Sequence, residues 1–280
     1  MDVKTQSRAA ALLNAEKPEK AKQESPLSFA FFLLKLVIAV LIFRSLIFSP
    51  FSIPSESMLP RLWNGDYLLA AKWSYGYSSY SLPYSAPLLP GRLLAGPPER
   101  GDVVIFKHPI DETDYIKRVI GLPGDSVAMV EGTVILNGEP VEREAMDDFV
   151  IPLSLNTSCA WGGDQMISPR GETACHYTRY RETLPGGRQY EVLDFGRTPS
   201  DDFPPIIVPD GHMFVMGDNR DNSRDSRFEA RAGDAVGIVP QDNLVGQASI
   251  IMWSTDGSAE WVKPWTWFTA ARWDRIGRTI

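Results

Sequence analysis

One segment of this chain is too apolar to fold as an ordinary surface element. The run SFAFFLLKLVIAVLIFRSLIF extends from Ser28 to Phe48. A run of this length is enough for a helix to cross the hydrocarbon core of a bilayer, which is about 30 Å thick. Lys35 and Arg44 interrupt the run away from its centre, where their long side chains reach the bilayer surface. The run therefore predicts a transmembrane helix over residues 28–48.

A cleaved signal peptide is the alternative for this run. We favour a permanent anchor because the run is longer than a usual signal-peptide core and SPFSIPSES, which follows it, has no A-x-A exit site. Three lysines lie shortly before the run, whereas Arg61 is the only basic residue shortly after it. The positive-inside rule then predicts a cytoplasmic tail over residues 1–27, with residues 49–280 outside the cytoplasm.

The residues after the run have the pattern of a mostly β domain. The 22 prolines and 22 glycines of the whole chain, with short runs such as GDVVIFKH and HMFVMGD after the apolar segment, favour strands and turns over helices. Asn137–Gly138 follows an alternating run and predicts a hairpin turn. The polar stretch at about 141–204 is predicted to be an insertion in this domain. The net charge of −7 provides no basic field that would favour nucleic acid.

The chain has only two cysteines, Cys159 and Cys175, and both follow the apolar run. Outside the cytoplasm we expect one disulfide between them, worth roughly 3 kcal/mol for a loop of this size, with two free thiols as the alternative. No CxxC spacing is present, so the cysteines do not indicate a metal site.

Two further segments have unusual composition. Residues 74–98 are rich in Ser, Tyr, Pro and Gly, and loops of such length are often functional. The carboxyl-terminal segment mixes arginines with four tryptophans, Trp261, Trp265, Trp267 and Trp273. These tryptophans either contact a membrane interface or cap the β-core, and the sequence leaves both interpretations open.

The stretch PSESMLP places Ser55 and Ser57 two residues apart, just after the apolar run. Serines at such a place most often belong to a linker, because a serine nucleophile needs a base. The three histidines, His108, His176 and His212, are candidates for that base in a spatial triad. No G-x-S-x-G motif accompanies them, which weakens this alternative.

Lys117 is the other candidate base. It lies in DYIKRVIGLPGDSV, a β-like run with apolar neighbours. An exposed strand lysine would stay charged, but burial disfavours the ammonium and lowers its pKa from about 10.4 by several units. A neutral amine of this kind takes a proton from a serine hydroxyl.

A third stretch, MGDNRDNSRDSRFEAR, alternates acidic and basic residues. Asp221, Ser223 and Asp225 match alternate positions of a calcium loop, but the expected glycine and glutamate are missing. Paired charges that hold a turn are therefore the favoured interpretation, and Ser223 can hydrogen-bond a neutral lysine amine.

Four stretches in order resemble the type I signal peptidase family, the membrane-bound Ser/Lys proteases. They are IPSESMLP at 53–60, RGDVVIFKHP at 100–109, YIKRVIGLPGD at 115–125 and GHMFVMGDNRDNSRDSR at 211–227. The resemblance covers roughly residues 28–255 and matches the single-span bacterial form. It implies a mostly β fold, a signal-peptidase-like β-domain with a variable insertion, preceded by one transmembrane helix.

The resemblance also implies a role for each site residue. Ser57 would be the nucleophile, Lys117 the general base, Ser55 an oxyanion donor and Ser223 the residue that orients Lys117. Ion pairs would support the site, and these are Asp218 with Arg220 and Asp225 with Arg227. The substrate-binding residues would be Phe51, Ile53, Pro54, Met58, Asp114 and Ile116.

The implied activity is that of a serine endopeptidase, which cleaves amino-terminal signal peptides after small residues at −3 and −1. No metal or organic cofactor is expected. The expected partners are preprotein signal peptides and the bilayer, with the enzyme a monomer in the bacterial inner membrane and its catalytic domain in the periplasm. One alternative is a pilus-processing or self-cleaving Ser/Lys protease, and another is a non-catalytic anchored β-domain that binds secreted peptides.

Overall fold

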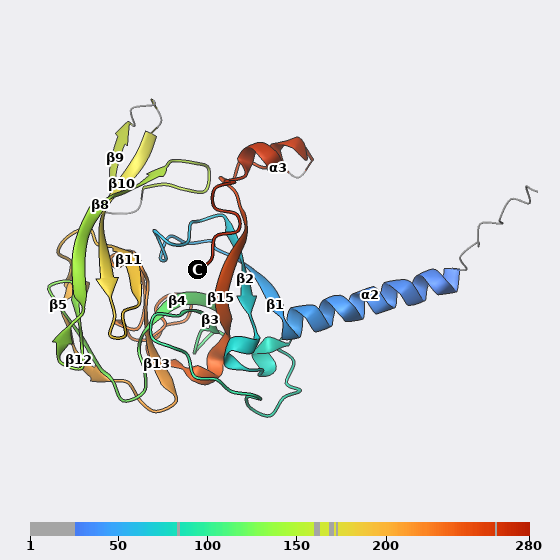
Figure 1. The fold of residues 1–280 in the computed structure, drawn as a ribbon, viewed down its shortest axis with the longest axis horizontal. Helices are drawn as coiled ribbons and strands as arrows, with labels where there is room; N and C mark the ends of the chain where they lie inside the picture. The colour runs from blue at the N-terminus through green and yellow to red at the C-terminus, as the bar shows by residue number, and fades with distance from the viewer. Residues whose placement is uncertain (1–25, 83–84, 160–162, 168–170, 172, 261) are drawn as a thin grey trace, which may run out of the picture. The chain divides into compact units, whose positions relative to one another are not determined.

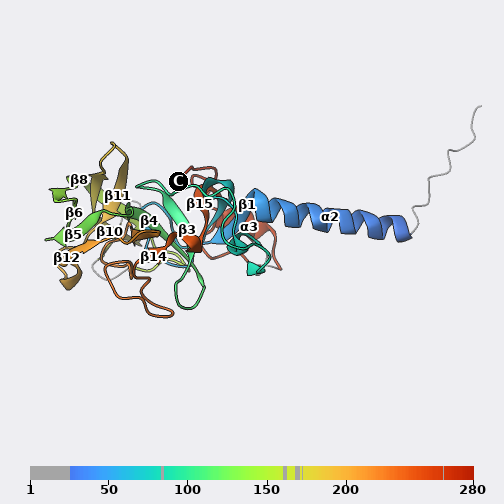
Figure 2. The same cartoon turned by 90° about the horizontal axis from the view of Figure 1, so that it is seen from below.

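The computed structural model of this chain describes residues 26–82, 85–159, 163–167, 171, 173–260 and 262–280 (Figures 1 and 2). The predicted cytoplasmic tail, apart from its last two residues, and Trp261 lie outside the described residues. The chain divides into two compact units, Met1–Leu41 and Ile42–Ile280, and each is considered by itself.

Helix α2 (Pro26–Leu46) covers residues 28–46 of the predicted membrane segment. It is the one helix in the described part of the chain that is long and apolar enough to cross a membrane, and none of its apolar window is buried. It begins two residues earlier than predicted because Pro26 fits the first turn of a helix. It ends before Phe48, which already belongs to a strand. An apolar surface on every side is what a lipid-exposed helix requires.

The second unit contains fifteen strands among the described residues. In chain order they are β1 (Phe48–Ser52), β2 (Asp66–Ala71), β3 (Val103–Lys107), β4 (Asp114–Gly121), β5 (Ser126–Val130), β6 (Thr133–Leu136), β7 (Glu139–Pro140), β8 (Glu142–Pro152), β9 (Asp164–Ile167), β10 (Thr173–Thr183), β11 (Gln189–Leu193), β12 (Phe203–Ile207), β13 (His212–Met216), β14 (Val239–Pro240) and β15 (Leu244–Ser254). The helical elements are η1 (Trp73–Tyr75), η2 (Ser79–Ser81), η4 (Pro199–Asp201), η5 (Gln241–Asn243) and α3 (Trp265–Ala270). The prediction of a mostly β domain after one apolar helix is confirmed.

These strands form three sheets. A seven-stranded sheet has the order β1-β2-β15-β3-β4-β13-β14, and two four-stranded sheets contain β8 to β11 and β5, β6, β7 and β12. In both views the two smaller sheets gather on one side of the domain, while β1, β2 and β15 lie on the other (Figures 1 and 2). The predicted hairpin is confirmed, since Leu136 pairs with Glu139 and both Asn137 and Gly138 have positive φ.

Strand β3 shows how the large sheet supports two cores. All but its last residue are buried, and side chains alternate between the faces. Val103 and Ile105 join one apolar cluster, whereas Val104 and Phe106 join another on the opposite face. The first cluster also contains Met58, which follows Ser57 directly. The segment between β1 and β2 that carries Ser57, residues 53–65, is called the serine loop. It is therefore anchored in the core of the main sheet.

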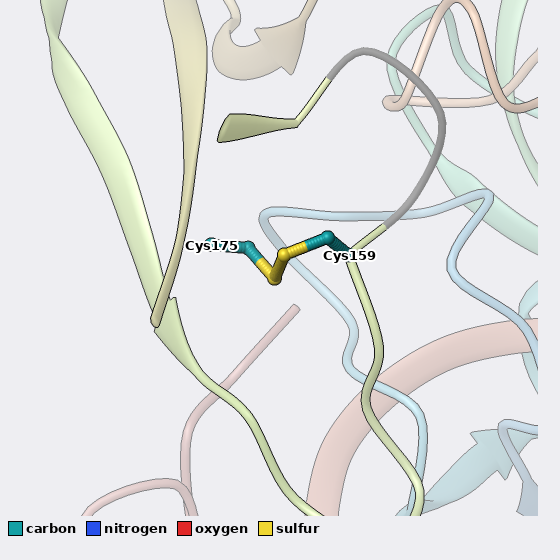
Figure 3. The surroundings of a disulfide bond; sticks show 2 residues. All are labelled: Cys159 and Cys175. Carbon is teal, nitrogen blue, oxygen red and sulfur yellow. A yellow bond between two sulfur atoms is a disulfide. The ribbon is translucent and has the colours of Figure 1, made fainter. Parts of the chain in front are cut away.

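The polar stretch predicted as an insertion contains the sheet of β8, β9, β10 and β11, held by the disulfide Cys159–Cys175 (Figure 3). The Cα atoms of the two cysteines are 5.4 Å apart. Cys175 is fully buried in a cluster with Tyr177 of β10 and with Leu59, two residues after Ser57. The insertion therefore packs against the serine loop as well as against itself.

Two buried arginines form ion pairs near the junction of this sheet with the main one, and the pair of Arg220 joins the two. Arg118 of β4 donates to Asp218 at 2.7 and 2.6 Å, and Arg220 donates to Glu182 of β10 at 2.8 and 2.5 Å. The expected pairing of Asp218 with Arg220 is therefore wrong. The register explains the difference, because Met216 pairs with Arg118 and brings Asp218 beside β4.

The three carboxyl-terminal tryptophans that the structure describes, Trp265, Trp267 and Trp273, are not buried in the β-core, although the ring of Trp273 lies 5.8 Å from that of Trp253 in β15. In and after α3, Trp265 is 65% exposed and Trp273 is 56% exposed. The arginines instead attach the segment to the domain, since Arg275 forms a buried ion pair with Asp66 at the start of β2. Contact of these tryptophans with lipid stays a prediction.

Removal of the Glu182 carboxylate should destabilise the domain strongly, because Arg220 would be left buried without its partner. For Glu182→Ala we expect a loss of about 3–5 kcal/mol in unfolding free energy. The matched control is Glu144→Ala, which removes the exposed partner of Arg181 and should cost under about 1 kcal/mol. Urea unfolding followed by tryptophan fluorescence measures both, and equal costs for the two variants would contradict this account.

Candidate active site

Ser57 lies in a turn between β1 and β2 that is held in place on both sides. Before it, Ile53 is buried and its backbone N–H donates to the carbonyl of Asp66 at 2.8 Å. After it, the N–H of Leu62 donates to the carbonyl of Met58 at 2.9 Å, and both side chains are fully buried. Ser57 itself is only 8% exposed. The apolar neighbours therefore fix the position of a hydroxyl at the edge of the core.

Lys117 reaches this hydroxyl from strand β4. Its Nζ donates to Ser57 Oγ at 2.8 Å and to the carbonyl of Ile116 at 3.0 Å. The side chain is 4% exposed, and its residue pairs with Val104 in the centre of the sheet. The structure thus brings together two residues that are 60 positions apart in the chain.

Burial changes the acid–base chemistry of Lys117. It lowers the pKa of the ammonium from 10.5 to about 8, against the opposing effect of Asp225 and Asp218 and with a smaller contribution from Arg227. A substantial fraction of the amine is therefore neutral near pH 8. A neutral amine within hydrogen-bond distance of a hydroxyl has the geometry of a general base.

Ser55 provides a second hydroxyl at the same place. Its Oγ lies 3.4 Å from Ser57 Oγ, and the residue is exposed to solvent. Substrate can therefore approach both hydroxyls from the same side.

The segment after β13 holds the backbone of the serine turn. The N–H of Asn219 donates to the carbonyl of Ser57 at 3.1 Å, and its Nδ2 donates to the carbonyl of Glu56 at 3.2 Å. Gly217 permits this approach, because a Cβ there would lie 2.5 Å from the Ser57 carbonyl oxygen. Gly217 and Asn219 lie in the GDNR part of the fourth stretch but were not among the residues predicted for the site.

Ser223 lies in the same loop and is buried. A Cβ on Gly217 would come within 2.3 Å of its Oγ, so this hydroxyl lies against the backbone that holds Ser57. Within the described residues no hydrogen bond joins Ser223 to Lys117, which donates to Ser57 and Ile116 instead. Orientation of Lys117 by Ser223 stays a prediction.

Asp225 and Arg227 form the ion pair expected from the sequence, with Nε and Oδ1 2.8 Å apart. Burial would raise the pKa of Asp225, but the guanidinium of Arg227 outweighs it and holds the pKa below its usual range. Asp225 also accepts from the N–H of Gly217 at 3.0 Å, and Arg227 donates to the carbonyl of Arg220. The pair therefore shapes the loop that touches Ser57.

A cleft of about 370 Å³ opens in front of the two serines. The predicted substrate residues that line it are Phe51, Ile53, Pro54, Asp114 and Ile116. Met58 does not line the cleft, because it is fully buried in the apolar cluster beneath it. Three residues that were not predicted to bind substrate also line the cleft, and these are Asn222, Arg224 and Asp234.

The alternative chemistries fit these contacts poorly. His108 is fully buried, and its ring contacts backbone groups of Ile110, Asp111 and Ala235. No hydrogen bond given for the described residues joins a histidine to a serine. In the stretch considered for calcium, Asp221 accepts from the N–H of Phe195 at 2.6 Å, and Asp225 is paired with Arg227. These carboxylates therefore bind protein groups that hold the loop.

Comparison with known proteins identifies the family. The family described as "Signal peptidase, peptidase S26" matches residues 27–253. Signal peptidase I of Rickettsia typhi is 36% identical over 252 residues, which cover 86% of this chain and 84% of that protein. Signal peptidase I of Rickettsia felis is 36% identical over 245 residues, with 84% and 80% covered.

A solved structure of signal peptidase I from Enterococcus faecalis covers 55% of this chain and 98% of its own, at 22% identity and a TM-score of 0.29. The family assignment does not depend on that structure. It depends on the length of the family match and on the identity to the rickettsial proteins. This chain therefore belongs to the signal peptidase family, peptidase S26, and is a serine endopeptidase.

Proposed function

We propose that this chain cleaves signal peptides from preproteins with Ser57 as nucleophile and Lys117 as general base. The observation that carries the proposal is the 2.8 Å contact between Lys117 Nζ and Ser57 Oγ in a buried setting. The relatives named signal peptidase I support the substrate class. A peptide-binding domain without catalysis would have no use for a buried lysine in contact with a serine hydroxyl.

The reaction follows from this contact. Neutral Lys117 accepts the proton of the Ser57 hydroxyl while Oγ attacks the scissile carbonyl, and the resulting ammonium then protonates the leaving amine. The acyl group is left as an ester on Ser57. Lys117 next takes a proton from water, which attacks the ester carbonyl. The bond from that carbon to Ser57 Oγ then breaks, the Lys117 ammonium returns its proton to Oγ, and the signal peptide is released as a carboxylic acid. The bond from Nζ to the carbonyl of Ile116 keeps the amine directed at these atoms.

Ser55 and the backbone N–H of Ser57 would bind the oxyanion that forms in both steps. The Ser55 hydroxyl lies 3.4 Å from the attacking oxygen and is free to turn toward the cleft. Removal of one such donor in another serine protease costs about 2.7–4 kcal/mol of transition-state stabilisation.

The cleft favours an extended peptide with small side chains. Residues 51–55, Ser57 and residues 114–117 line it, so a bound strand can pair with backbone on either side. Ile53 and Ile116 fill the space near the serines. Small residues at −1 and −3 fit between them, and larger ones meet packed side chains.

The rest of the molecule is consistent with action outside the cytoplasm. A disulfide indicates an oxidising compartment, here the bacterial periplasm. Only a few residues separate the end of α2 from Ser57, which would keep the site near the membrane where a signal peptide emerges. A cytoplasmic amino terminus, a monomeric enzyme and the absence of nucleic-acid partners belong to the same proposal.

Removal of either catalytic side chain should abolish cleavage. For Ser57→Ala and Lys117→Met we expect the rate of preprotein cleavage in detergent to fall by at least about 10³-fold. Ser55→Ala should lower it by about 10²–10³-fold. The controls are Ser258→Ala and Lys263→Met at exposed positions, which should cleave like the wild type. Near-full activity of Lys117→Met would show that another group is the base.

The pH dependence of cleavage should follow the titration of the buried Lys117. Because burial lowers the pKa of Lys117 to about 8, the protonated inactive form prevails below pH 8 and the neutral active form above it. We therefore expect kcat/KM, measured on a peptide without titratable groups, to rise with a midpoint near pH 8. A midpoint near pH 6.5 would point to a histidine instead, and one near 10.5 to an exposed lysine.

Ile116 should limit the size of the substrate side chains that the cleft accepts at −1 and −3. We expect peptides with Phe in place of Ala at −1 or −3 to be cleaved at least about 10²-fold more slowly by the wild type. In Ile116→Ala, peptides with Val or Leu at −1 or −3 should be cleaved at a rate closer to that of the Ala peptide, because the substitution enlarges the pocket. Ile110→Ala, at an exposed position, is the matched control. If Ile116→Ala has the same selectivity as the wild type, Ile116 does not contribute to the specificity pocket.

A further inference from the structure

A second buried lysine lies beside the proposed substrate cleft. Lys72 follows β2 directly and is 3% exposed. Its Nζ has one long hydrogen bond, 3.5 Å to the carbonyl of Tyr80, and lies 5.9 Å from the ring centre of Phe51. None of the carboxylates in the described ranges forms an ion pair with it. The proposed reaction does not use this lysine.

An ammonium in this position has fewer hydrogen-bond acceptors than it can use. A lysine ammonium has three donors, and a buried charge without a partner is costly. Burial lowers the pKa of Lys72 to about 8, while the nearby Asp114 acts in the opposite direction. Asp114 cannot serve as a full partner, because its carboxylate already accepts from Lys107 at 2.9 Å.

Lys72 lines a cavity of about 150 Å³ next to the cleft. Phe51 and Asp114 line both spaces, so the cavity adjoins the cleft at the end away from Ser57. Its charged lining residues are Arg44, Lys72, Lys107 and Asp114, three cations to one anion. Four serines and the side chains of Phe51, Tyr80, Leu82 and Val245 also line it. This chemistry suits a negatively charged group that also accepts hydrogen bonds.

The cavity lies on the side from which the early part of a substrate would come. Arg44 and Ser45, at the end of α2, are among its lining residues. A signal peptide carries its apolar segment before the cleavage site, so the residues just upstream of −3 leave the membrane on this side. Those residues would therefore pass the cavity before the chain reaches Ser57.

We propose that the cavity lined by Lys72 and Lys107 is an upstream subsite that binds an acidic side chain of the substrate between positions −4 and −7. The proposal rests on the proposed function and adds a selectivity to it. Lys72 is the contacting residue, since its free donors face the cavity and Lys107 is already paired with Asp114. The substrate carboxylate would replace the missing partner of Lys72.

The test uses the full chain in detergent and peptides with Ala at −1 and −3. Glu, Gln, Ala or Lys is placed in turn at each position from −4 to −7, and kcat/KM is measured. At one position we expect wild type to prefer Glu over Lys by about tenfold, the discrimination of one charge-assisted hydrogen bond. Lys72→Met should reduce this ratio to near one while it still cleaves the all-Ala peptide.

Lys263→Met is the matched control, because it removes an exposed ammonium and should leave the Glu preference intact. Equal cleavage of Glu and Lys peptides by wild type at all four positions overturns the proposal without any variant. A Glu preference that persists in Lys72→Met overturns it as well. These outcomes are distinct from failure of the proposed function, in which Ser57→Ala would cleave every peptide like wild type.

Discussion

The burial of one ammonium group is the constraint on which the rest of this site depends. In the proposed mechanism Lys117 can act as the base only while its charge is disfavoured, and its depressed pKa has desolvation as its largest cause. That desolvation requires the packed centre of the seven-stranded sheet, where Lys117 pairs with Val104. Any change that admits water to this strand would raise the pKa and weaken the base without touching Ser57.

The buried ion pairs extend this constraint across the domain. Arg118, the next residue on β4, is paired with Asp218 and lies over the ring of Tyr190 at 4.4 Å. Tyr190 in turn donates to Glu182, the partner of Arg220. The sheet that contains β10 and β11 is thus joined by charges to both the lysine strand and the loop that holds Ser57. The insertion takes part in the architecture of the site, although none of its described residues lines the 370 Å³ cleft.

Under the proposed function, closeness to the membrane would give this arrangement its use. A short connection leads from α2 to the serine turn, and the cleft and the adjoining cavity both lie along that connection. A substrate whose apolar segment lies in the bilayer would meet the cationic cavity first and the serines afterwards. Selectivity for small residues and selectivity for upstream charge would then come from two adjoining spaces with different walls, one apolar and one basic.

The sequence by itself determined the apolar helix, the mostly β character and the hairpin at Asn137–Gly138, because these follow from local composition and turn chemistry. It also indicated Ser57 and Lys117 as partners through a family resemblance. Only the tertiary structure decided that Asp218 pairs with Arg118 while Arg220 pairs with Glu182, since strand register and not chain proximity selects the partner of a buried charge. The same holds for Met58, which the core buries completely, and for Lys72, whose lack of a partner depends on how distant segments pack around it.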